Sequence, residues 1–255
     1  MILTIDIGNT NIVFGCSRDN EILFIERVAT RSTSTDAEYA IAFKNVLELH
    51  GMDNEEIEGA IISSVVPSAT NSVRRAVRKL ADIDVLVVGP GVKNGLKIKT
   101  DNPAQLGSDL VVDAVAAVAE YTAPLIICDF GTATTISVVS AEKEYLGGVI
   151  MPGVKVSHDS LVGRTAQLPK ISFDPPKHVI GTNTVDCMKS GMLFATASSI
   201  DGMVERIEEE LGEKTTVIAT GGLASTIIPL CRREIIVDDM LLLKGLMIIY
   251  NKNKG

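Results

Sequence analysis

The sequence predicts an α/β protein made of two similar domains, each with the element order β-β-β-α-β-α-β-α and with a cleft between them. Two observations support this. One apolar strand ends in the turn Asp6-Ile7-Gly8-Asn9-Thr10, and another ends in the similar turn Asp129-Phe130-Gly131-Thr132-Ala133. After each turn, strand and helix patterns follow in the same order. We therefore expect one domain over residues 1–115 and the other over residues 116–255.

Three apolar or alternating runs, separated by turn residues, predict three strands at the start of the chain. Thr35 and Glu38 form a capping box and Gly51 is a suitable stop, so a helix is expected between them. In order, this half is expected to contain strands over 1–7, 11–17 and 21–29, a helix over 37–50, a strand over 59–66, a helix after residue 68, a strand over 84–88, a glycine-rich loop and a helix over 108–121.

The second half repeats this pattern with a longer helical stretch and a proline-rich loop in its middle. It is expected to contain strands over 124–130, 134–140 and 145–151, helices over 155–162 and 184–211, a strand over 215–220, a helix over 223–232, a strand over 234–238 and a final helix.

The composition excludes several classes of protein. Of 255 residues, 46% are apolar and 22% are charged, which is typical of a globular chain with a sizeable core. The formal net charge is −8 and no block of Lys or Arg occurs, so neither nucleic acid nor a membrane is expected as a partner. The densest basic stretch, residues 72–80, has helical spacing and is interpreted as the solvated face of an amphipathic helix.

The sequence also predicts a cytoplasmic location. Four cysteines lie far apart without a Cys-x-x-Cys pair, and we interpret them as reduced, buried thiols: Cys16, Cys128, Cys187 and Cys231. No apolar run reaches the roughly 18 residues that a membrane span requires. Met1 leads directly into a strand pattern, so no signal peptide is expected.

The paired turns are suited to binding phosphate. Gly8 and Gly131 permit a tight reversal and let a ligand approach the backbone. Exposed N–H groups in such turns bind anions, and a carboxylate at a strand end can hold a hydrated Mg²⁺ together with substrate phosphates. Two such turns could clamp a polyphosphate. The alternative is that each Asp-x-Gly simply suits a hairpin turn.

A third glycine turn, Gly221-Gly222, follows a strand and precedes a helix, and offers a surface for an adenine or a ribose. Other nucleotide motifs are missing from the sequence. Gly148 and Gly153 have the spacing of a P-loop, but Val154 stands where Lys is required. No Gly-x-Gly-x-x-Gly and no zinc-ligand spacing occurs, so a Rossmann dehydrogenase, a P-loop enzyme and a zinc enzyme are disfavoured.

Taken in order, DIGNTN, SSVVP, NPAQLGSDL, DFGTATT, GGVIMPG, TAQLP and TGG resemble the motifs of type III pantothenate kinases, over nearly the whole chain. That family belongs to the acetate and sugar kinase, heat-shock ATPase and actin superfamily. The resemblance implies duplicated ribonuclease H-like domains with ATP in the cleft. It also implies ATP-dependent phosphorylation of pantothenate to 4'-phosphopantothenate, the first step of coenzyme A biosynthesis. Mg²⁺ and a monovalent cation, K⁺ or NH₄⁺, are implied as cofactors, and a homodimer that completes the pantothenate pocket at its interface is implied as the assembly.

The resemblance implies roles for individual residues. Asp109 is expected to be the general base, Asp129 to bind the monovalent cation, and Asp6 to lie near Mg²⁺. ATP is expected to contact Asp6, Ile7, Gly8, Asn9, Thr10, Asn11, Ile12, Val13, Thr132, Gly221 and Gly222. Pantothenate is expected to contact Thr100, Gly107, Ser108, Leu110 and Thr184. Two structural alternatives stay open: an acidic residue such as Asp109 is favoured in the first turn of a helix, and Thr184 is suited to an N-cap.

The chain departs from the family on the acceptor side. Leu110 stands where the family usually has Arg, and Thr100 where it usually has Tyr. Loss of a charge-assisted hydrogen bond costs ~1.5–3 kcal/mol, or about ten- to a hundredfold in affinity. Lys97 or Lys99 could compensate.

Three hypotheses follow: a pantothenate kinase with an altered pocket, a kinase of the same fold for another small hydroxyl compound, or a non-catalytic nucleotide-binding regulator. Retention of Asp109 argues against the regulator, because a protein that only binds nucleotide needs no base there.

Overall fold

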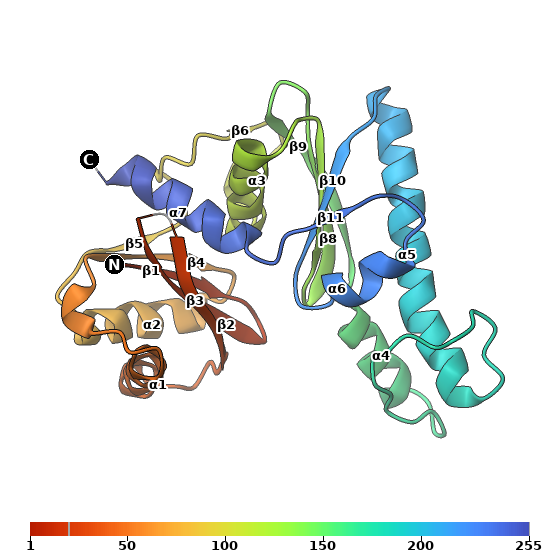
Figure 1. Ribbon diagram of the computed structural model, residues 1–255, viewed down its shortest axis with the longest axis horizontal. Helices are drawn as coiled ribbons and strands as arrows, with labels where there is room; N and C mark the ends of the chain where they lie inside the picture. Colours follow the sequence, from red (N-terminus) through yellow and green to blue (C-terminus); the bar gives the residue numbers. More distant parts are fainter. Residues whose placement is uncertain (20, 255) are drawn as a thin grey trace. The chain divides into compact units, whose positions relative to one another are not determined.

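The computed structural model describes residues 1–19 and 21–254, and its contacts divide the chain into two compact units (Figure 1). Unit 1 comprises residues 1–96, 101–116 and 241–255, and unit 2 comprises residues 97–100 and 117–240. The domain bounds expected from the sequence, 1–115 and 116–255, stay a prediction, and residue 255 lies outside the described residues. The last helix, residues 241–253, packs within unit 1.

The sheet of unit 1 has the strand order β3-β2-β1-β4-β5. Its strands are β1 (Ile2–Ile7), β2 (Asn11–Arg18), β3 (Glu21–Ala29), β4 (Gly59–Ser64) and β5 (Val85–Val87). β1 is antiparallel to β2 and parallel to β4, with Asp6 opposite Ser63 in the parallel pair. The carboxyl ends of β1 and β4 therefore meet at one edge of the sheet.

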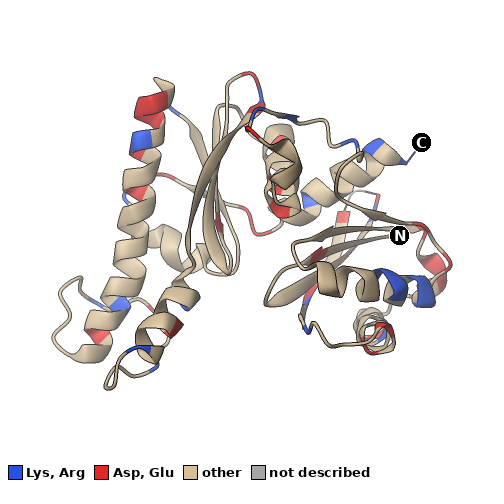
Figure 2. Cartoon of the chain, turned by 180° about the vertical axis from the view of Figure 1, so that it is seen from behind, with Lys and Arg blue, Asp and Glu red and all other residues tan. Residues whose placement is uncertain are grey.

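Two helices bury their apolar faces on one side of this sheet: α1 (Asp36–Leu49) and α2 (Pro67–Leu80). The expected capping box at the start of α1 is confirmed, since the Glu38 backbone N–H donates to Thr35 Oγ1 and the Thr35 N–H donates to the Glu38 carboxylate at 2.7 Å. Figure 2 shows basic residues towards the C-terminal end of α2, where Arg75 and Lys79 reach Asp36. The amphipathic interpretation of this basic stretch is thereby confirmed.

The other side of the sheet is covered by α7 (Leu241–Asn253), while α3 (Ser108–Glu120) begins in unit 1. Glycines allow this close approach. A Cβ on Gly15 would lie 2.9 Å from a methyl carbon of Leu243, and a Cβ on Gly59 would lie 1.9 Å from the hydroxyl of Tyr250. A Cβ on Gly245 of α7 would lie 2.1 Å from the backbone oxygen of Val112 in α3.

Unit 2 has the sheet order β11-β10-β7-β8-β9-β6. Its strands are β6 (Lys97–Ile98), β7 (Leu125–Phe130), β8 (Ala133–Val139), β9 (Glu144–Pro152), β10 (Thr216–Thr220) and β11 (Ile236–Val237). Without β6, which the sequence does not predict, the order β9-β8-β7-β10-β11 repeats the order β3-β2-β1-β4-β5 of unit 1. The predicted duplication of the sheet topology is therefore confirmed.

The helices of unit 2 are α4 (Val154–Gly163), α5 (Thr184–Leu211) and α6 (Ala224–Ile227). They pack on the sheet face that carries Ile126, Cys128 and Phe130. Helix α5 has the predicted bounds, and Gly212 ends it in a left-handed conformation at φ +75°. Helix α6 is shorter than predicted because a 3-10 turn containing Pro229 replaces its second half. Two further 3-10 turns are Asn54–Glu56 and Pro103–Gln105.

The four cysteines carry free thiols, as expected, but the prediction that all are buried is wrong. Cys16 and Cys128 are buried, whereas Cys231 is partly exposed and Cys187 is exposed. Among the described residues, no helix is long and apolar enough to span a membrane.

Glu208 forms a buried ionic cluster at the end of α5. Its carboxylate accepts hydrogen bonds from Lys214 Nζ at 2.8 Å, Arg233 Nη2 at 3.2 Å and the Thr215 N–H at 3.1 Å. Burial alone would raise the pKa of this carboxyl, but the hydrogen bonds outweigh it and lower the pKa to about 2. The ionised group therefore stabilises the fold at neutral pH.

Gly245→Ala tests the packing of α7. Because the new methyl group would meet a backbone oxygen, we expect the free energy of unfolding to fall by about 1–3 kcal/mol, despite the gain in helix propensity. Urea unfolding monitored by circular dichroism measures this. Gly163→Ala, at an α4 position with open space around it, is the control and should be neutral or stabilising. Equal effects of the two substitutions would contradict the packing argument.

Glu208→Gln tests the ionic cluster. Loss of the charged hydrogen bonds should lower the free energy of unfolding by about 1.5–3 kcal/mol at pH 7. Since the folded-state pKa lies below the unfolded value near 4.5, the contribution is full above that value and is lost as pH falls towards about 2. Urea titrations between pH 3 and 7 should show the two proteins converge in stability with acid. A pH-independent difference would contradict this origin.

Candidate functional site

The first turn closes the hairpin of β1 and β2 in unit 1. Asp6 is buried at the end of β1, and the Gly8 N–H donates to the Asn11 backbone oxygen at 3.0 Å. Thr30, just beyond β3, holds the turn from the side: its Oγ1 donates to the Gly8 oxygen at 2.7 Å, and its N–H donates to the Thr10 oxygen at 3.0 Å. The sequence did not indicate this role for Thr30.

The tip of this turn presents polar groups to the outside. Asn9, Thr10 and Asn11 are exposed, while Ile7 and Ile12 are fully buried in the core. The two isoleucines can therefore offer a ligand only their backbone groups. An exposed polar tip beside a buried carboxylate is suited to the phosphate groups of a nucleotide.

Asp109 lies in the first turn of α3, also in unit 1. Its Oδ1 accepts a hydrogen bond from the Leu110 N–H at 2.9 Å. Burial raises the pKa of its carboxyl above the usual range, and the hydrogen bonds from Leu110 and from its own backbone N–H only partly oppose this. A Cβ on Gly107 would lie 2.5 Å from Asp109 Oδ1, so a side chain there would displace the carboxylate. A carboxylate with a raised pKa is suited to accepting a proton.

Ser108 fastens this turn to the end of β4. Its Oγ lies 3.0 Å from Ser63 Oγ, accepts from the Ser64 N–H at 3.1 Å and donates to the Ser64 oxygen at 3.1 Å. Ser63 is opposite Asp6 in the parallel pair of β1 and β4. The two carboxylates of unit 1 that are expected to act in the site, Asp6 and Asp109, are therefore both held at the same edge of the sheet.

The second turn lies at the end of β7 in unit 2. Asp129 is opposite Thr220 of β10 in a parallel pair, and Gly221 follows at φ +94°. A Cβ on Gly221 would lie 2.3 Å from Asp129 Oδ1 and 2.6 Å from the Phe130 nitrogen. The glycine turn at Gly221 and Gly222 therefore packs directly against the turn that follows Asp129. Gly222 and Thr132 are exposed beside it.

Gly153 packs against the backbone of the second turn, a contact that the sequence did not predict. Its N–H donates to the Thr132 oxygen at 3.1 Å, and a Cβ there would lie 2.3 Å from that same oxygen. The segment GGVIMPG resembled the family, but nothing in the spacing of these residues alone points to this contact.

Thr100 follows β6 in unit 2, and its Oγ1 is buried without a hydrogen-bond partner among the described residues. A buried hydroxyl without a partner is costly, and a bound ligand can supply the missing partner. The two lysines proposed to compensate for the lost Arg both contact Glu144: Lys97 forms a close ion pair, and Lys99 Nζ lies 3.6 Å from its Oε2. Their charges are therefore already partly neutralised.

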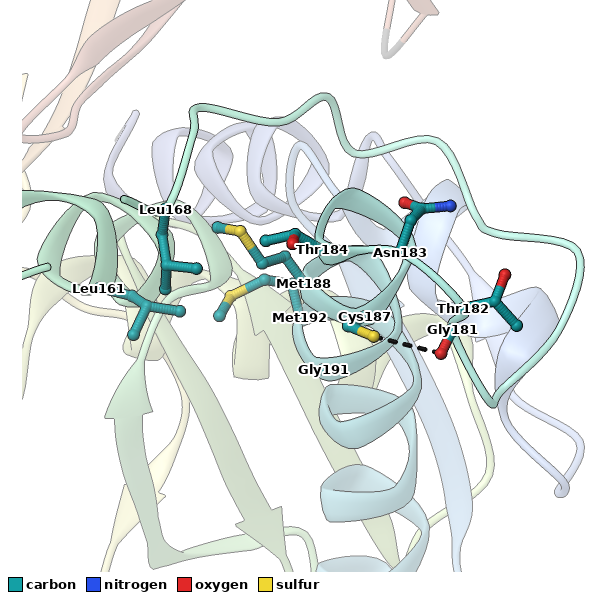
Figure 3. Close-up of a pocket in the computed structure, with 10 residues that line it drawn as sticks. All are labelled: Leu161, Leu168, Gly181, Thr182, Asn183, Thr184, Cys187, Met188, Gly191 and Met192. Carbon is teal, nitrogen blue, oxygen red and sulfur yellow. Dashed lines mark hydrogen bonds between the residues drawn. The ribbon is translucent and has the colours of Figure 1, made fainter. Parts of the chain in front are cut away.

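Thr184 lines a pocket of about 560 Å³ in unit 2 (Figure 3). Met188 and Met192 of α5 face Leu161 and Leu168 across it, while residues 181–183 form a more polar side. The N-cap of α5 is Asn183, whose side chain accepts from the Asp186 N–H, so the capping role considered for Thr184 is wrong. Its exposed hydroxyl remains available to a ligand.

No group of three or more His, Cys, Asp or Glu side chains in the described part of the chain could hold a metal ion. Mg²⁺ needs no such group, because it binds proteins through one or two carboxylates and takes its other ligands from water and phosphate. Asp6, buried beside an exposed polar turn, fits such a site.

The expected site residues thus fall into two groups. Unit 1 holds the first turn, residues 6–13, and the loop 107–110, and the structure ties them together through Ser63 and Ser108. Unit 2 holds Asp129, Thr132 and the glycine turn 221–222, which lie together, and also Thr100 and Thr184, which lie on other elements.

Comparison with known proteins shows the family of this chain. The family model described as type III pantothenate kinase matches residues 2–206. A curated type III pantothenate kinase from Halalkalibacterium halodurans is 42% identical over 253 residues, which cover 99% of this chain and 100% of that protein.

Solved structures support the fold. A putative 2-dehydro-3-deoxygalactonokinase from Sinorhizobium meliloti aligns with a TM-score of 0.61 at 12% identity, covering 100% of this chain and 97% of that one. A conserved putative Baf family transcriptional activator from Campylobacter jejuni aligns with a TM-score of 0.59 at 19% identity, covering 98% of both chains. The predicted α/β fold of duplicated ribonuclease H-like domains is therefore confirmed. The chain belongs to the type III pantothenate kinase family.

Proposed function

We propose that Asp109 is the base with which this chain carries out the reaction of its family. That reaction is the phosphorylation of pantothenate by ATP, the first step of coenzyme A biosynthesis. The observation that carries the proposal is the placement of Asp109. Its carboxylate is partly buried, has a raised pKa and lies in the first turn of a helix fastened beside the Asp6 turn.

The two turns would hold ATP. The backbone and side chains of residues 6–13 bind its phosphates, and Thr132 is a further contact with the nucleotide. Asp6 would hold Mg²⁺ together with the phosphates, and the ion would supply positive charge where negative charge develops on the transferred group. Gly221 and Gly222 offer the adenosine a surface without side chains, and Gly222 is exposed with open space around its Cα.

Asp129 would bind the monovalent cation, K⁺ or NH₄⁺. Its carboxylate is partly exposed at the end of β7. A cation there adds positive charge near the phosphates, which is the electrostatic support that phosphoryl transfer requires.

The acceptor side would be formed by Gly107, Ser108, Leu110, Thr100 and Thr184. The unpartnered hydroxyl of Thr100 and the exposed hydroxyl of Thr184 can each donate to a carboxylate or an amide of pantothenate. The apolar side of the pocket at Thr184 suits the two methyl groups of the substrate. We further infer a homodimer in which this pocket completes the partner's site, and a cytoplasmic location.

Asp109 orients the acceptor hydroxyl of pantothenate and takes its proton as the oxygen bonds to the γ-phosphorus. The bond between that phosphorus and the bridging oxygen breaks, and ADP leaves. Because the transition state is loose, the proton moves late and the base needs only a moderate pKa. Its raised value nevertheless favours proton acceptance.

Asp109→Asn tests this role. We expect pantothenate-dependent ATP consumption, assayed with Mg²⁺ and K⁺, to fall by at least about a hundredfold. Since the folded-state pKa is raised, the ionised carboxylate reduces stability at neutral pH, and this penalty is absent at pH values below the unfolded pKa. The variant should therefore be at least as stable as the parent at pH 7.

Asp82→Asn, at an exposed position, is the matched control and should keep full activity. Full turnover by Asp109→Asn would remove Asp109 from the mechanism. A parent chain that binds ATP but never phosphorylates pantothenate would contradict the proposed acceptor instead.

Leu110→Arg tests the departure from the family. If Arg in this place binds a charged group of pantothenate, the substitution should lower the KM for pantothenate by about ten- to a hundredfold while the KM for ATP is unchanged. Ala104→Arg adds the same charge at an exposed position nearby and is the control. An equal change in both variants would assign the effect to net charge.

A further inference from the structure

We propose that Ser63, together with Ser108, is a positioning residue that sets the place of Asp109. This inference rests on the proposed function, because it assigns Asp109 as the base. The segment SSVVP, residues 63–67, contains none of the residues expected to contact ATP or pantothenate, but it holds Ser108. Ser63 is fully buried, so it cannot itself contact substrate.

Residues of β4 use the full hydrogen-bonding capacity of the Ser108 hydroxyl. It has one proton, which it donates to the Ser64 oxygen, and two lone pairs. One lone pair accepts from the Ser64 N–H, so the contact of 3.0 Å with Ser63 requires Ser63 to be the donor. The hydroxyl can therefore form no further hydrogen bond with a ligand. The substrate contact expected of Ser108 would have to come from its backbone groups.

The end of β4 is itself braced. Ser64 Oγ accepts from Thr70 Oγ1 at 2.7 Å and from the Val66 N–H at 3.1 Å, and Thr70 Oγ1 also lies 3.0 Å from the Val66 oxygen. These contacts join β4 to the first turn of α2. Ser108 is thus attached to a part of the sheet whose conformation is fixed by several hydrogen bonds.

The attachment point determines where the base lies. Asp109 follows Ser108 directly, and the helical turn is closed by the Val111 N–H, which donates to the Gly107 oxygen at 3.2 Å. On the other side, Ser63 is opposite Asp6 in the parallel pair. The chain of contacts Asp109–Ser108–Ser63–Asp6 therefore relates the base to the phosphate turn within unit 1.

The test compares Ser63→Ala with Ser17→Ala, a matched control. Both serines are fully buried in the same sheet, but Ser17 bonds to the Ile2 oxygen and Met247 Sδ instead. We expect Ser63→Ala to lower kcat about tenfold with unchanged KM for ATP, because small displacements of a reacting group slow catalysis strongly. Ser17→Ala should leave kcat unchanged. In the Asp109→Asn background, Ser63→Ala should cause no further loss, since coupled residues are not additive.

Hydrogen exchange measured by mass spectrometry on peptides covering residues 107–111 tests the attachment independently of turnover. Exchange there should be faster in Ser63→Ala than in the parent or in Ser17→Ala. Unchanged exchange and unchanged kcat would overturn the inference, as would an additive loss in the Asp109→Asn background. Faster exchange in a chain that does not phosphorylate pantothenate would retain the attachment and overturn its catalytic meaning, together with the proposed function.

Discussion

The parallel pairing of the central strands is the constraint on which the site depends. In unit 1, β1 and β4 run in the same direction, so Asp6 and Ser63 arrive at the same edge of the sheet. In unit 2, β7 and β10 repeat this arrangement and bring Asp129 opposite Thr220, directly before the Gly221 turn. Strand pairing alone therefore brings together residues that are far apart in the sequence, such as Asp6 and Ser63, at the ends of neighbouring strands. In each unit, the antiparallel hairpin partner on the other side of the central strand closes the Asp-x-Gly turn.

The two units share a sheet topology but differ at that edge. Unit 1 adds the first turn of α3, with the partly buried carboxylate of Asp109, whose pKa is raised by desolvation, and so it supplies a group able to take a proton. At the corresponding edge, unit 2 has closely packed glycines in place of such a carboxylate. Gly221 and Gly153 pack closely against the turn at Asp129, and neither leaves room for a side chain. One duplicated scaffold thus carries two different edges, and the proposed function assigns the base to the edge of unit 1 and nucleotide contacts to the edge of unit 2.

The departures from the family are confined to the acceptor side. Leu110 and Thr100 replace the usual Arg and Tyr, whereas both turns keep their carboxylate and glycine. The hydroxyl of Thr100 is buried without a partner among the described residues, and the neighbouring Lys97 and Lys99 are drawn to Glu144. Under the proposed function, the acceptor would be recognised without the Arg, and the hydroxyl of Thr100 is one group that could supply a contact.

The sequence by itself determined the order of the elements, the capping box of α1, both bounds of α5 and the two Asp-x-Gly turns, because each depends on neighbours a few residues away. It also identified the family, through several short motifs in order. Only the tertiary structure decided that α7 packs on the first sheet, that Gly153 supports the turn at Thr132, and that Ser63 holds Ser108. The raised pKa of Asp109 belongs to this second group. Each of these features arises from burial or from contacts between distant segments, and local sequence patterns carry no record of which surfaces come together in the folded chain.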